Sequence, residues 1–215
     1  MSGDLLPRER VEIAPGAHHI PDWLSGERQR SLVDACREWA RPPAPMHATK
    51  VRGGVMSART VCLGWHWLPY RYTRVAEDVD GAPVKAFPAW LGDLARAAVT
   101  AAYGDAVDYA PDCALVNFYD AEARMGMHQD NEEVVPAPVV SLSLGDDCVF
   151  RFGNTVDRKR PYTDVVLRSG DLFVFGRASR AAFHGVTRII PGTGDPAIGL
   201  HAGRLNLTIR ETGLG

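Results

Sequence analysis

The amino-acid sequence predicts one mainly β domain with a closed or sandwiched sheet and flanking helices. Short strand-like runs, separated by turns that carry Gly or Asp, fill the chain after residue 112, and this pattern is typical of sandwiches and barrels. Two stretches with helical spacing precede these runs. The 215 residues, 46% of them hydrophobic, can bury a sizeable core, and this length fits one large domain better than two.

The first helix is expected at about 26–40, because apolar residues recur there at helical spacing. Ser25 is a suitable N-cap, and the Pro-rich run 41–45 ends the helix. Its apolar stripe comprises Leu32, Cys36 and Trp39.

The second helix is expected at Ala89–Tyr103, with Gly104 just beyond its end. Four residues at helical spacing form its predicted core-facing stripe, which comprises Trp90, Leu94, Ala97 and Ala101. Aromatic residues in both stripes are expected to pack in the core.

Six strands are expected in the second half of the chain, at 139–144, 148–152, 164–167, 172–175, 183–186 and 204–210. The last strand alternates polar residues (Arg204, Asn206, Thr208 and Arg210) with apolar ones (Leu205, Leu207 and Ile209). On an isolated strand the polar face would be solvated, but inside a closed sheet two unpaired Arg would require an anionic ligand. The planar guanidinium fork suits a dicarboxylate.

A candidate metal site begins at His128 and Asp130. Side chains at positions i and i+2 of a strand project from the same face, so these two can bind one ion together. One further His would complete two imidazoles and a carboxylate, which is the ligand set of non-haem Fe(II) oxygenases. The same set with one open position also serves zinc hydrolases, and a lone His-x-Asp pair is more often part of a surface loop.

A series of short motifs gives this pair its context. In chain order they are Leu63-Gly64-Trp65, the pair Tyr70 and Tyr72, Asn117-Phe118-Tyr119, His128-Gln129-Asp130, Ser141-Leu142-Ser143-Leu144-Gly145, Phe152-Gly153, Ser169-Gly170-Asp171, His184-Gly185 and the run 204–210. From about residue 50 to the C-terminus, this series resembles the AlkB family of Fe(II)- and 2-oxoglutarate-dependent dioxygenases, in particular its bacterial type.

The resemblance implies a double-stranded β-helix, or jelly roll, flanked by the helices. Within a single domain, 1–215, it implies an N-terminal extension at 1–50, a nucleotide-recognition region at about 50–110 and a jelly-roll core at 112–213. The implied ligands of Fe(II) are His128, Asp130 and His184.

The resemblance also implies that 2-oxoglutarate and O₂ are co-substrates. Arg204 would pair with the distal carboxylate of 2-oxoglutarate, with Tyr119 nearby, and Arg210 would lie near the carboxylate at the metal. Hydrogen bonds to the bound co-substrate would come from Asn117 and Asn206.

The reaction implied by the resemblance is oxidative demethylation of N-alkylated bases such as 1-methyladenine and 3-methylcytosine, in DNA or RNA. Decarboxylation of 2-oxoglutarate would be coupled to hydroxylation of the methyl group, and formaldehyde and succinate would be released. Because such a methyl lies on the Watson–Crick edge, the base must be single-stranded or flipped out of the duplex.

Six residues are expected on the substrate side of the site. Trp65 matches the family's stacking tryptophan, whereas Trp67 is expected to pack in the core, and Tyr70 and Tyr72 match a pair near the substrate phosphates. Three charged residues complete the set: Glu132, which stands where the best-known bacterial type has Asp; Arg158, which aligns with a lesion-side Arg after a one-residue shift; and Arg124, where the family carries a phosphate-contacting Lys.

Three other function classes are weighed against this one. A related oxygenase acting on a small molecule or a protein side chain would keep the iron and 2-oxoglutarate residues but would have no use for Trp65, Tyr70 and Tyr72. A nucleic-acid-binding module with a redundant metal centre would not need the intact set of ligands. Zinc hydrolysis would leave Arg204 and Arg210 without a role.

Charge and composition limit the remaining possibilities. The net charge of −2, from 24 Lys and Arg against 26 Asp and Glu, argues against tight non-specific duplex binding. A local basic rim, or simply a set of solvated loop charges, could come from Lys50, Arg52, Arg59, Arg71, Arg74, Arg124 and the run 158–160.

The expected setting of the protein follows from its cysteines and its apolar runs. The four Cys lack paired spacing and are expected to be reduced and mostly buried. The sequence shows neither a secretory signal nor an apolar run of membrane-spanning length. We therefore expect a cytoplasmic monomer that has no contact with membranes and no obligate protein partner.

Overall fold

The computed structural model describes residues 7–104 and 107–215, so the first six residues of the expected N-terminal extension lie outside the described part. The larger of two sheets has seven strands, in the spatial order β1 (Val11–Ala14), β2 (Ala17–Ile20), β13 (Leu172–Phe175), β10 (Val139–Gly145), β15 (Arg204–Arg210), β8 (Cys113–Tyr119) and β5 (Arg59–Leu63). The smaller sheet has the order β12 (Tyr162–Leu167), β11 (Asp147–Gly153), β14 (His184–Ile190) and β9 (Met125–His128).

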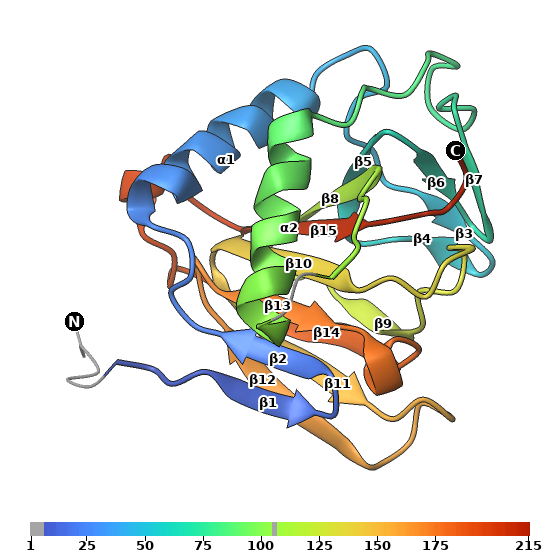
Figure 1. Ribbon diagram of the computed structural model, residues 1–215. Helices are drawn as coiled ribbons and strands as arrows, with labels where there is room; N and C mark the ends of the chain where they lie inside the picture. Colours follow the sequence, from blue (N-terminus) through green and yellow to red (C-terminus); the bar gives the residue numbers. More distant parts are fainter. Residues whose placement is uncertain (1–6, 105–106) are drawn as a thin grey trace.

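Both sheets are antiparallel throughout, and they pack against each other as the predicted jelly roll (Figure 1). Phenylalanines on the facing sides of β11 and β13 fill the space between them, and the ring centroids of Phe150 and Phe173 are 5.0 Å apart. Two short ribbons lie outside the sheets: β3 (Lys50–Val51) with β4 (Gly54–Val55), and β6 (His66–Leu68) with β7 (Arg71–Thr73).

Two helices, α1 (Gly26–Trp39) and α2 (Ala89–Tyr103), lie on the outer face of the larger sheet (Figure 1). Both agree with the predicted ranges to within a residue. The Ser25 side chain accepts a hydrogen bond from the Arg28 backbone N–H, which confirms the expected N-cap, and Gly104 ends α2 in the left-handed region at φ 75°. Two short 3₁₀ helices, η1 (Arg177–Ser179) and η2 (Pro196–Ile198), complete the fold.

The predicted core-facing stripe of α2 is wrong in part. Trp90 is 47% exposed and stacks on Trp39 of α1, with ring centroids 5.9 Å apart, and Ala97 is also exposed. Besides Gly92, the buried residues are Leu91, Leu94, Ala95, Ala98, Val99 and Ala102, of which only Leu94 belongs to the predicted stripe. These six form a continuous stripe at i, i+3 and i+4 spacing, and this stripe is wider than one that passes through Trp90.

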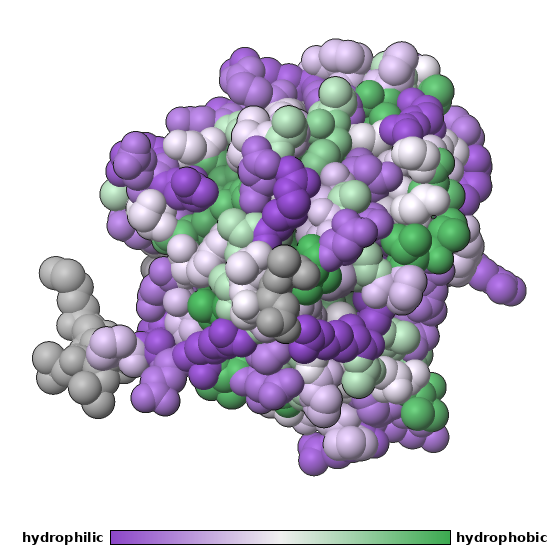
Figure 2. Space-filling view, viewed as in Figure 1, coloured by the Kyte–Doolittle hydropathy of each residue, from purple (hydrophilic) through white to green (hydrophobic). Residues whose placement is uncertain are grey.

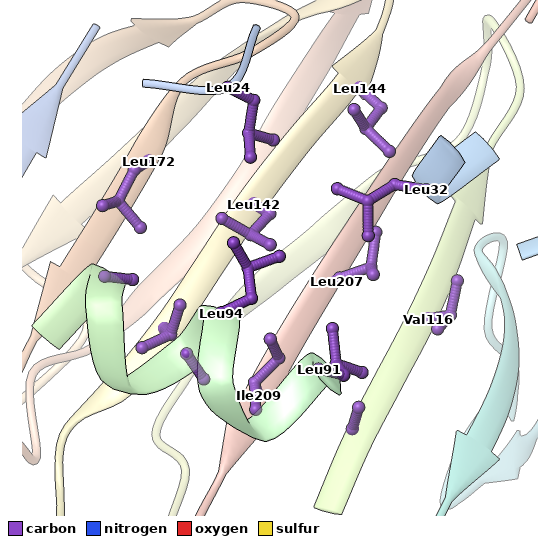
Figure 3. Packing of buried hydrophobic residues seen from close by; sticks show 14 of the residues in the cluster. Leu24, Leu32, Leu91, Leu94, Val116, Leu142, Leu144, Leu172, Leu207 and Ile209 are labelled. Carbon is purple, nitrogen blue, oxygen red and sulfur yellow. The ribbon is translucent and has the colours of Figure 1, made fainter. Parts of the chain in front are cut away.

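The apolar side of β15 is buried, as predicted, and it packs beneath the helices. Leu205, Leu207 and Ile209 are buried in the cluster that α1 and α2 cover, and Figure 3 shows Leu91 and Leu94 of α2 over Leu207 and Ile209. The polar side of β15, opposite to this packed side, therefore faces the smaller sheet. On the face of the molecule that the helices cover, hydrophilic and apolar side chains are interspersed (Figure 2).

The six predicted strands are confirmed as β10 to β15, with ends that differ by up to four residues. The strand β8, which follows α2 in the sequence, is not among the predicted ones. The shared metal site at His128 and Asp130 presupposes a strand through both, but β9 ends at His128 and Asp130 lies in the loop that follows. All four cysteines are free and buried, as expected. Within the described ranges, no helix combines the length and the apolar character needed to cross a membrane.

Candidate active site

A cavity of about 760 Å³ lies between the two sheets. This volume is typical of small-molecule sites, which range over about 300–1,000 Å³. Its walls include all the predicted metal and 2-oxoglutarate residues, which are His128, Asp130, His184, Asn117, Tyr119, Arg204, Asn206 and Arg210. The fold therefore brings together residues from four strands, β8, β9, β14 and β15, and the loop that carries Asp130.

The three predicted metal ligands converge at the smaller sheet. His128 of β9 and His184 of β14 are paired across the ladder, and Asp130 follows β9 directly. The Nε2 atom of His128 is 3.6 Å from Asp130 Oδ1, and that of His184 is 3.6 Å from Asp130 Oδ2. All three ligand atoms thus lie close enough to share one ion.

The backbone fixes the imidazoles for this purpose. The Nδ1 atoms of His128 and His184 lie 2.9 and 3.0 Å from the carbonyl oxygens of Gly126 and Ala182. A carbonyl can only accept, so each Nδ1 carries the hydrogen and each Nε2 presents a lone pair to the site. Burial lowers the pKa of His184 to about 4 despite the attraction of Asp130, which keeps this imidazole neutral at physiological pH.

Asp130 is an anion with one unused oxygen. Burial alone would raise the pKa of its carboxyl group, but Arg210 and the two histidines outweigh that effect and hold the pKa well below its usual range. Arg210 binds Oδ1 at 2.8 Å, whereas the buried Oδ2 has no hydrogen-bond partner. Because an unpaired buried carboxylate oxygen is costly, this atom beside two Nε2 lone pairs fits a divalent metal ion.

Arg210 is not the unpaired cation that its strand position predicts. Besides Asp130, it binds the Glu133 carboxylate at 2.9 Å and lies 2.9 Å from the Tyr72 hydroxyl. Arg180 binds the other oxygen of Glu133 at 2.8 Å and donates to the Asp130 carbonyl at 2.7 Å. The prediction of two unpaired Arg is therefore wrong for Arg210, since the segment after β9 supplies two carboxylates to it.

Arg204 does match the prediction of a cation that needs an anion. Its side chain is 1% exposed and donates to Ser143 Oγ at 3.0 Å and to the Leu205 carbonyl at 3.2 Å, while its Nε has no partner. Within residues 7–104 and 107–215, no carboxylate forms an ion pair with it. A buried guanidinium in this condition fits a carboxylate ligand, with Tyr119, whose ring centroid is 5.8 Å away, beside it.

On the larger sheet, polar residues that lie opposite one another on neighbouring strands form the rest of the cavity wall. Asn206 stands between Ser143 and Asn117 in the ladder, and Thr60 lies beyond Asn117. The Asn117 amide oxygen accepts a hydrogen bond from Thr60 at 2.7 Å. The Asn206 amide nitrogen donates to Ser141 Oγ at 2.7 Å and to the Leu142 carbonyl at 3.2 Å, so its expected donation to a ligand is not part of this arrangement.

Four of the six predicted substrate-side residues line the same cavity, namely Tyr70, Glu132, Arg124 and Arg158. Tyr70 is 80% exposed and, together with the exposed Arg124 and Arg158, stands at the mouth. Arg71, another member of the predicted basic rim, is engaged elsewhere, since it pairs with Glu77 at 2.7 Å.

Trp65 and Tyr72 are not among the residues that line the cavity. The Trp65 indole donates to Asp112 at 2.9 Å, and the Arg74 guanidinium lies 3.4 Å from the centroid of its ring. Gly64, in the left-handed region at φ 76°, turns the chain just before Trp65. Inside β6 it is Trp67, expected only in the core, that faces the cavity.

Tyr72 belongs to the support of Arg210. Its hydroxyl donates to Glu133 at 2.5 Å, and burial raises the pKa of this phenol well above its usual value. Neither Glu133 nor Arg180 is predicted from the sequence, because a carboxylate next to Glu132 and an arginine near a 3₁₀ turn carry no recognisable spacing. The pattern that identifies them is spatial.

Replacing Glu133 with alanine is expected to lower the free energy of unfolding by about 3 to 5 kcal/mol, since it removes the carboxylate that pairs with Arg180 and one of the two that pair with Arg210. Its side chain is 1% exposed. Chemical denaturation measures this loss. The matched control is Glu132→Ala, whose partly exposed carboxylate forms no ion pair with either arginine, and which should change stability by less than about 1 kcal/mol. Equal losses in the two variants would refute the assignment.

Comparisons with known proteins agree with this geometry. The family model of the 2OG-Fe(II) oxygenase superfamily matches residues 16–210. An alpha-ketoglutarate-dependent dioxygenase AlkB homolog from Caulobacter vibrioides is 38% identical over 94% of this chain and 90% of its own length.

Two further similarities extend to proteins from other sources. The DNA N(6)-methyladenine demethylase ALKBH1D of Arabidopsis thaliana is 32% identical over 97% of this chain, which spans about half (53%) of that relative's length. The solved structure of OsALKBH1 superimposes with a TM-score of 0.83 at 32% identity, covering 94% of this chain and all (100%) of that one.

Proposed function

Because this chain belongs to the AlkB family within the 2OG-Fe(II) oxygenase superfamily, we propose that it removes methyl groups oxidatively from nitrogen atoms of nucleic-acid bases. One observation carries the proposal. The unpartnered Asp130 Oδ2 and the unpaired Arg204 guanidinium line one cavity, whose mouth carries aromatic and basic side chains. A metal ion would bind at Asp130, an acidic co-substrate at Arg204 and a planar base beside the aromatic side chains at the mouth.

The residues assigned to the metal are His128, Asp130 and His184, and Arg204 would bind the distal carboxylate of 2-oxoglutarate. When bound, Fe(II) with 2-oxoglutarate and O₂ supplies the oxidation of a methyl C–H bond, coupled to decarboxylation of the co-substrate. The side chains of the protein would hold these groups in fixed positions relative to one another. Arg210 keeps the Asp130 carboxylate ionised and oriented, and Glu133 with Tyr72 keeps Arg210 in place.

The substrate base would enter through the mouth between Trp67 and Tyr70. The methyl group of a base such as 1-methyladenine is inaccessible inside a stacked duplex, so the base must come from a single strand or be flipped out. Glu132, at the same wall, would accept hydrogen bonds from an exocyclic amine or attract a cationic methylated base. The regions proposed to act together are the segment 50–110, which carries the two aromatics, and the core 112–213.

Phosphate contacts are assigned to Arg124 and Arg158 at the rim. Since the net charge of the chain is −2, binding would depend on these local cations rather than on a broad basic surface. We propose that the protein acts in this way as a monomer.

Formaldehyde release from defined oligonucleotides tests the proposal. Protein prepared anaerobically with Fe(II) and 2-oxoglutarate is mixed with an oligonucleotide that contains 1-methyladenine, 3-methylcytosine or N6-methyladenine, and O₂ is then admitted. We expect formaldehyde from at least one of the three and none from the matched unmethylated strand. Succinate formation without formaldehyde from any methylated DNA or RNA strand would favour an oxygenase for small molecules or protein side chains.

Replacing Trp65 and Trp67 with alanine, one at a time, distinguishes their roles. Trp67→Ala is expected to raise the KM for a methylated oligonucleotide by about 5- to 150-fold, because one stacked base contributes roughly 1–3 kcal/mol. Trp65→Ala should leave this KM within about threefold and lower thermal stability instead, since it exposes Asp112 and Arg74. Steady-state kinetics with thermal unfolding measures both, and the reverse pattern would restore Trp65 as the stacking residue.

A further inference from the structure

A second cluster of two imidazoles and a carboxylate lies outside the cavity. His47, His66 and Asp78 each present one ligand atom, and within the described chain these atoms lie within 4.8 Å of one another. None of the three lines the cavity of the candidate active site. They come from three separate segments: the stretch before β3, the first residue of β6 and the turn after β7.

The carboxylate of Asp78 is shared between the two imidazoles. Its Oδ1 lies 2.6 Å from His66 Nε2, and its Oδ2 lies 3.5 Å from His47 Nε2. The imidazole rings stack, with centroids 5.5 Å apart and an interplanar angle of 27°. Ligand atoms about 2.1 Å from a tetrahedral ion are about 3.4 Å apart, so the His47 contact already has the required separation, and an ion would replace the direct His66–Asp78 hydrogen bond.

The surroundings orient His47 as they orient the two histidines of the candidate active site. His47 Nδ1 lies 3.1 Å from the Pro45 carbonyl oxygen and must therefore donate to it, which leaves a lone pair on Nε2, the atom 3.5 Å from Asp78 Oδ2. The His66 side chain is 2% exposed, whereas Asp78 retains 26% exposure and gives an ion a way in. The hydroxyl of Thr49, 3.3 Å from His47 Nε2, is a neighbouring oxygen for a fourth position that water could also fill.

We propose that His47, His66 and Asp78 form a second metal site, of the kind that binds Zn²⁺ or a similar divalent ion. Two neutral imidazoles and one carboxylate suit such an ion. Bound there, the ion joins the loop that ends at Thr49 and the turn around Asp78 to β6, the strand that presents Trp67. Its role is structural: it holds the wall of the substrate-recognition region in place, apart from the chemistry at the active site.

Metal content tests the proposal independently of activity. In untagged full-length protein with both His128 and His184 replaced by Ala, the Asp130–Arg210 ion pair remains but the active-site imidazoles are absent. After chelation, incubation with Zn²⁺ and gel filtration, this variant is expected to retain one zinc per chain by elemental analysis, and the wild-type protein two. Zinc at about 100 times its Kd should also raise the melting temperature of the variant.

Asp78→Asn in the same background should remove the remaining zinc or weaken its binding. Loss of a residue that only hydrogen-bonds a metal ligand weakens metal affinity by roughly 10- to 100-fold, so loss of a ligand itself should weaken it by at least as much. The matched control is Asp80→Asn, two residues on, whose carboxylate accepts from the Ala44 and Ala82 backbone N–H groups; it should retain one zinc. An unchanged melting temperature without metal shows that Asp78→Asn still folds, and His66→Gln gives a second test.

Two results would overturn the proposal. The first is a His128→Ala/His184→Ala protein that retains no zinc. The second is one zinc per chain that survives both Asp78→Asn and His66→Gln. Because neither readout depends on demethylation, the second site stands or falls separately from the proposed function.

Discussion

Replacing Asp130 with alanine is expected to reduce both succinate formation and formaldehyde release to background. Asp130 supplies the only carboxylate of the proposed metal set, and its buried Oδ2 has no hydrogen-bond partner. The two histidines that remain provide no anionic ligand. Iron content after desalting, measured together with both products, separates loss of the metal from loss of a later step.

Two variants control for effects on folding. Asp130→Asn keeps the shape of the side chain and can still accept from Arg210, so its activity should be lost with a smaller loss of stability than in Asp130→Ala. Asn131→Ala changes the next residue, an exposed one that bonds to Gln129, and should retain activity. Turnover that survived in Asp130→Ala would show that the metal ligands are assigned wrongly.

Replacing Arg204 with methionine is expected to have opposite effects on ligand binding and on stability. Loss of the buried cation should weaken 2-oxoglutarate binding by about 100- to 4,000-fold, which corresponds to the 3–5 kcal/mol cost of breaking a buried ion pair. Without ligand, however, Arg204 is a buried charge that no carboxylate among the described residues neutralises. In the absence of metal and 2-oxoglutarate, the free energy of unfolding of the variant should therefore be higher than that of the wild-type protein by about 1–3 kcal/mol. The variant should accordingly unfold at a higher denaturant concentration.

Arg210→Met provides the contrast on the same strand. Arg210 already neutralises Asp130 and Glu133, so its removal should destabilise the ligand-free protein by about 3–5 kcal/mol. Isothermal titration with 2-oxoglutarate and chemical denaturation measure the two quantities. If Arg204→Met destabilised the ligand-free protein as Arg210→Met does, Arg204 would have a partner within the fold and would not await a ligand.

The strand Arg204–Arg210 shows how much the sequence can predict when one physical pattern dominates. Its alternation predicts the strand, its two faces and the cavity side, and all three are confirmed. The strand Cys113–Tyr119 is equally central, but its first five residues are all buried, so both faces of the strand are covered there. A strand covered on both sides loses its alternation, which explains why periodicity does not reveal it.

The helix α2 shows the limit of a stripe read from one sequence. Its ends follow from local chemistry, since Gly104 adopts a conformation that favours glycine. Which of two adjacent apolar stripes is buried depends on the sheet beneath. There the set that begins at Leu91 packs on the core, and Trp90 finds a partner in Trp39 instead.

In the candidate site, too, some residues are predictable from the sequence and others depend on the three-dimensional fold. The metal ligands and Arg204 follow from motif residues whose chemistry is specific, and the structure brings them to one cavity. The relative placement of Trp65 and Trp67 depends on a single turn at Gly64. The support of Arg210 by Glu133 and Arg180 depends on contacts between residues 47 to 77 positions apart, a separation that no local pattern encodes.

The ratio of formaldehyde to succinate tests the central claim most directly. Wild-type protein with Fe(II), limiting 2-oxoglutarate and excess methylated single-stranded oligonucleotide is exposed to O₂, and both products are measured in the same sample. Oxidative demethylation predicts one formaldehyde for each succinate, with the unmodified base restored in equal amount. Succinate that accumulates without formaldehyde, at the rate seen when the oligonucleotide is omitted, would contradict it.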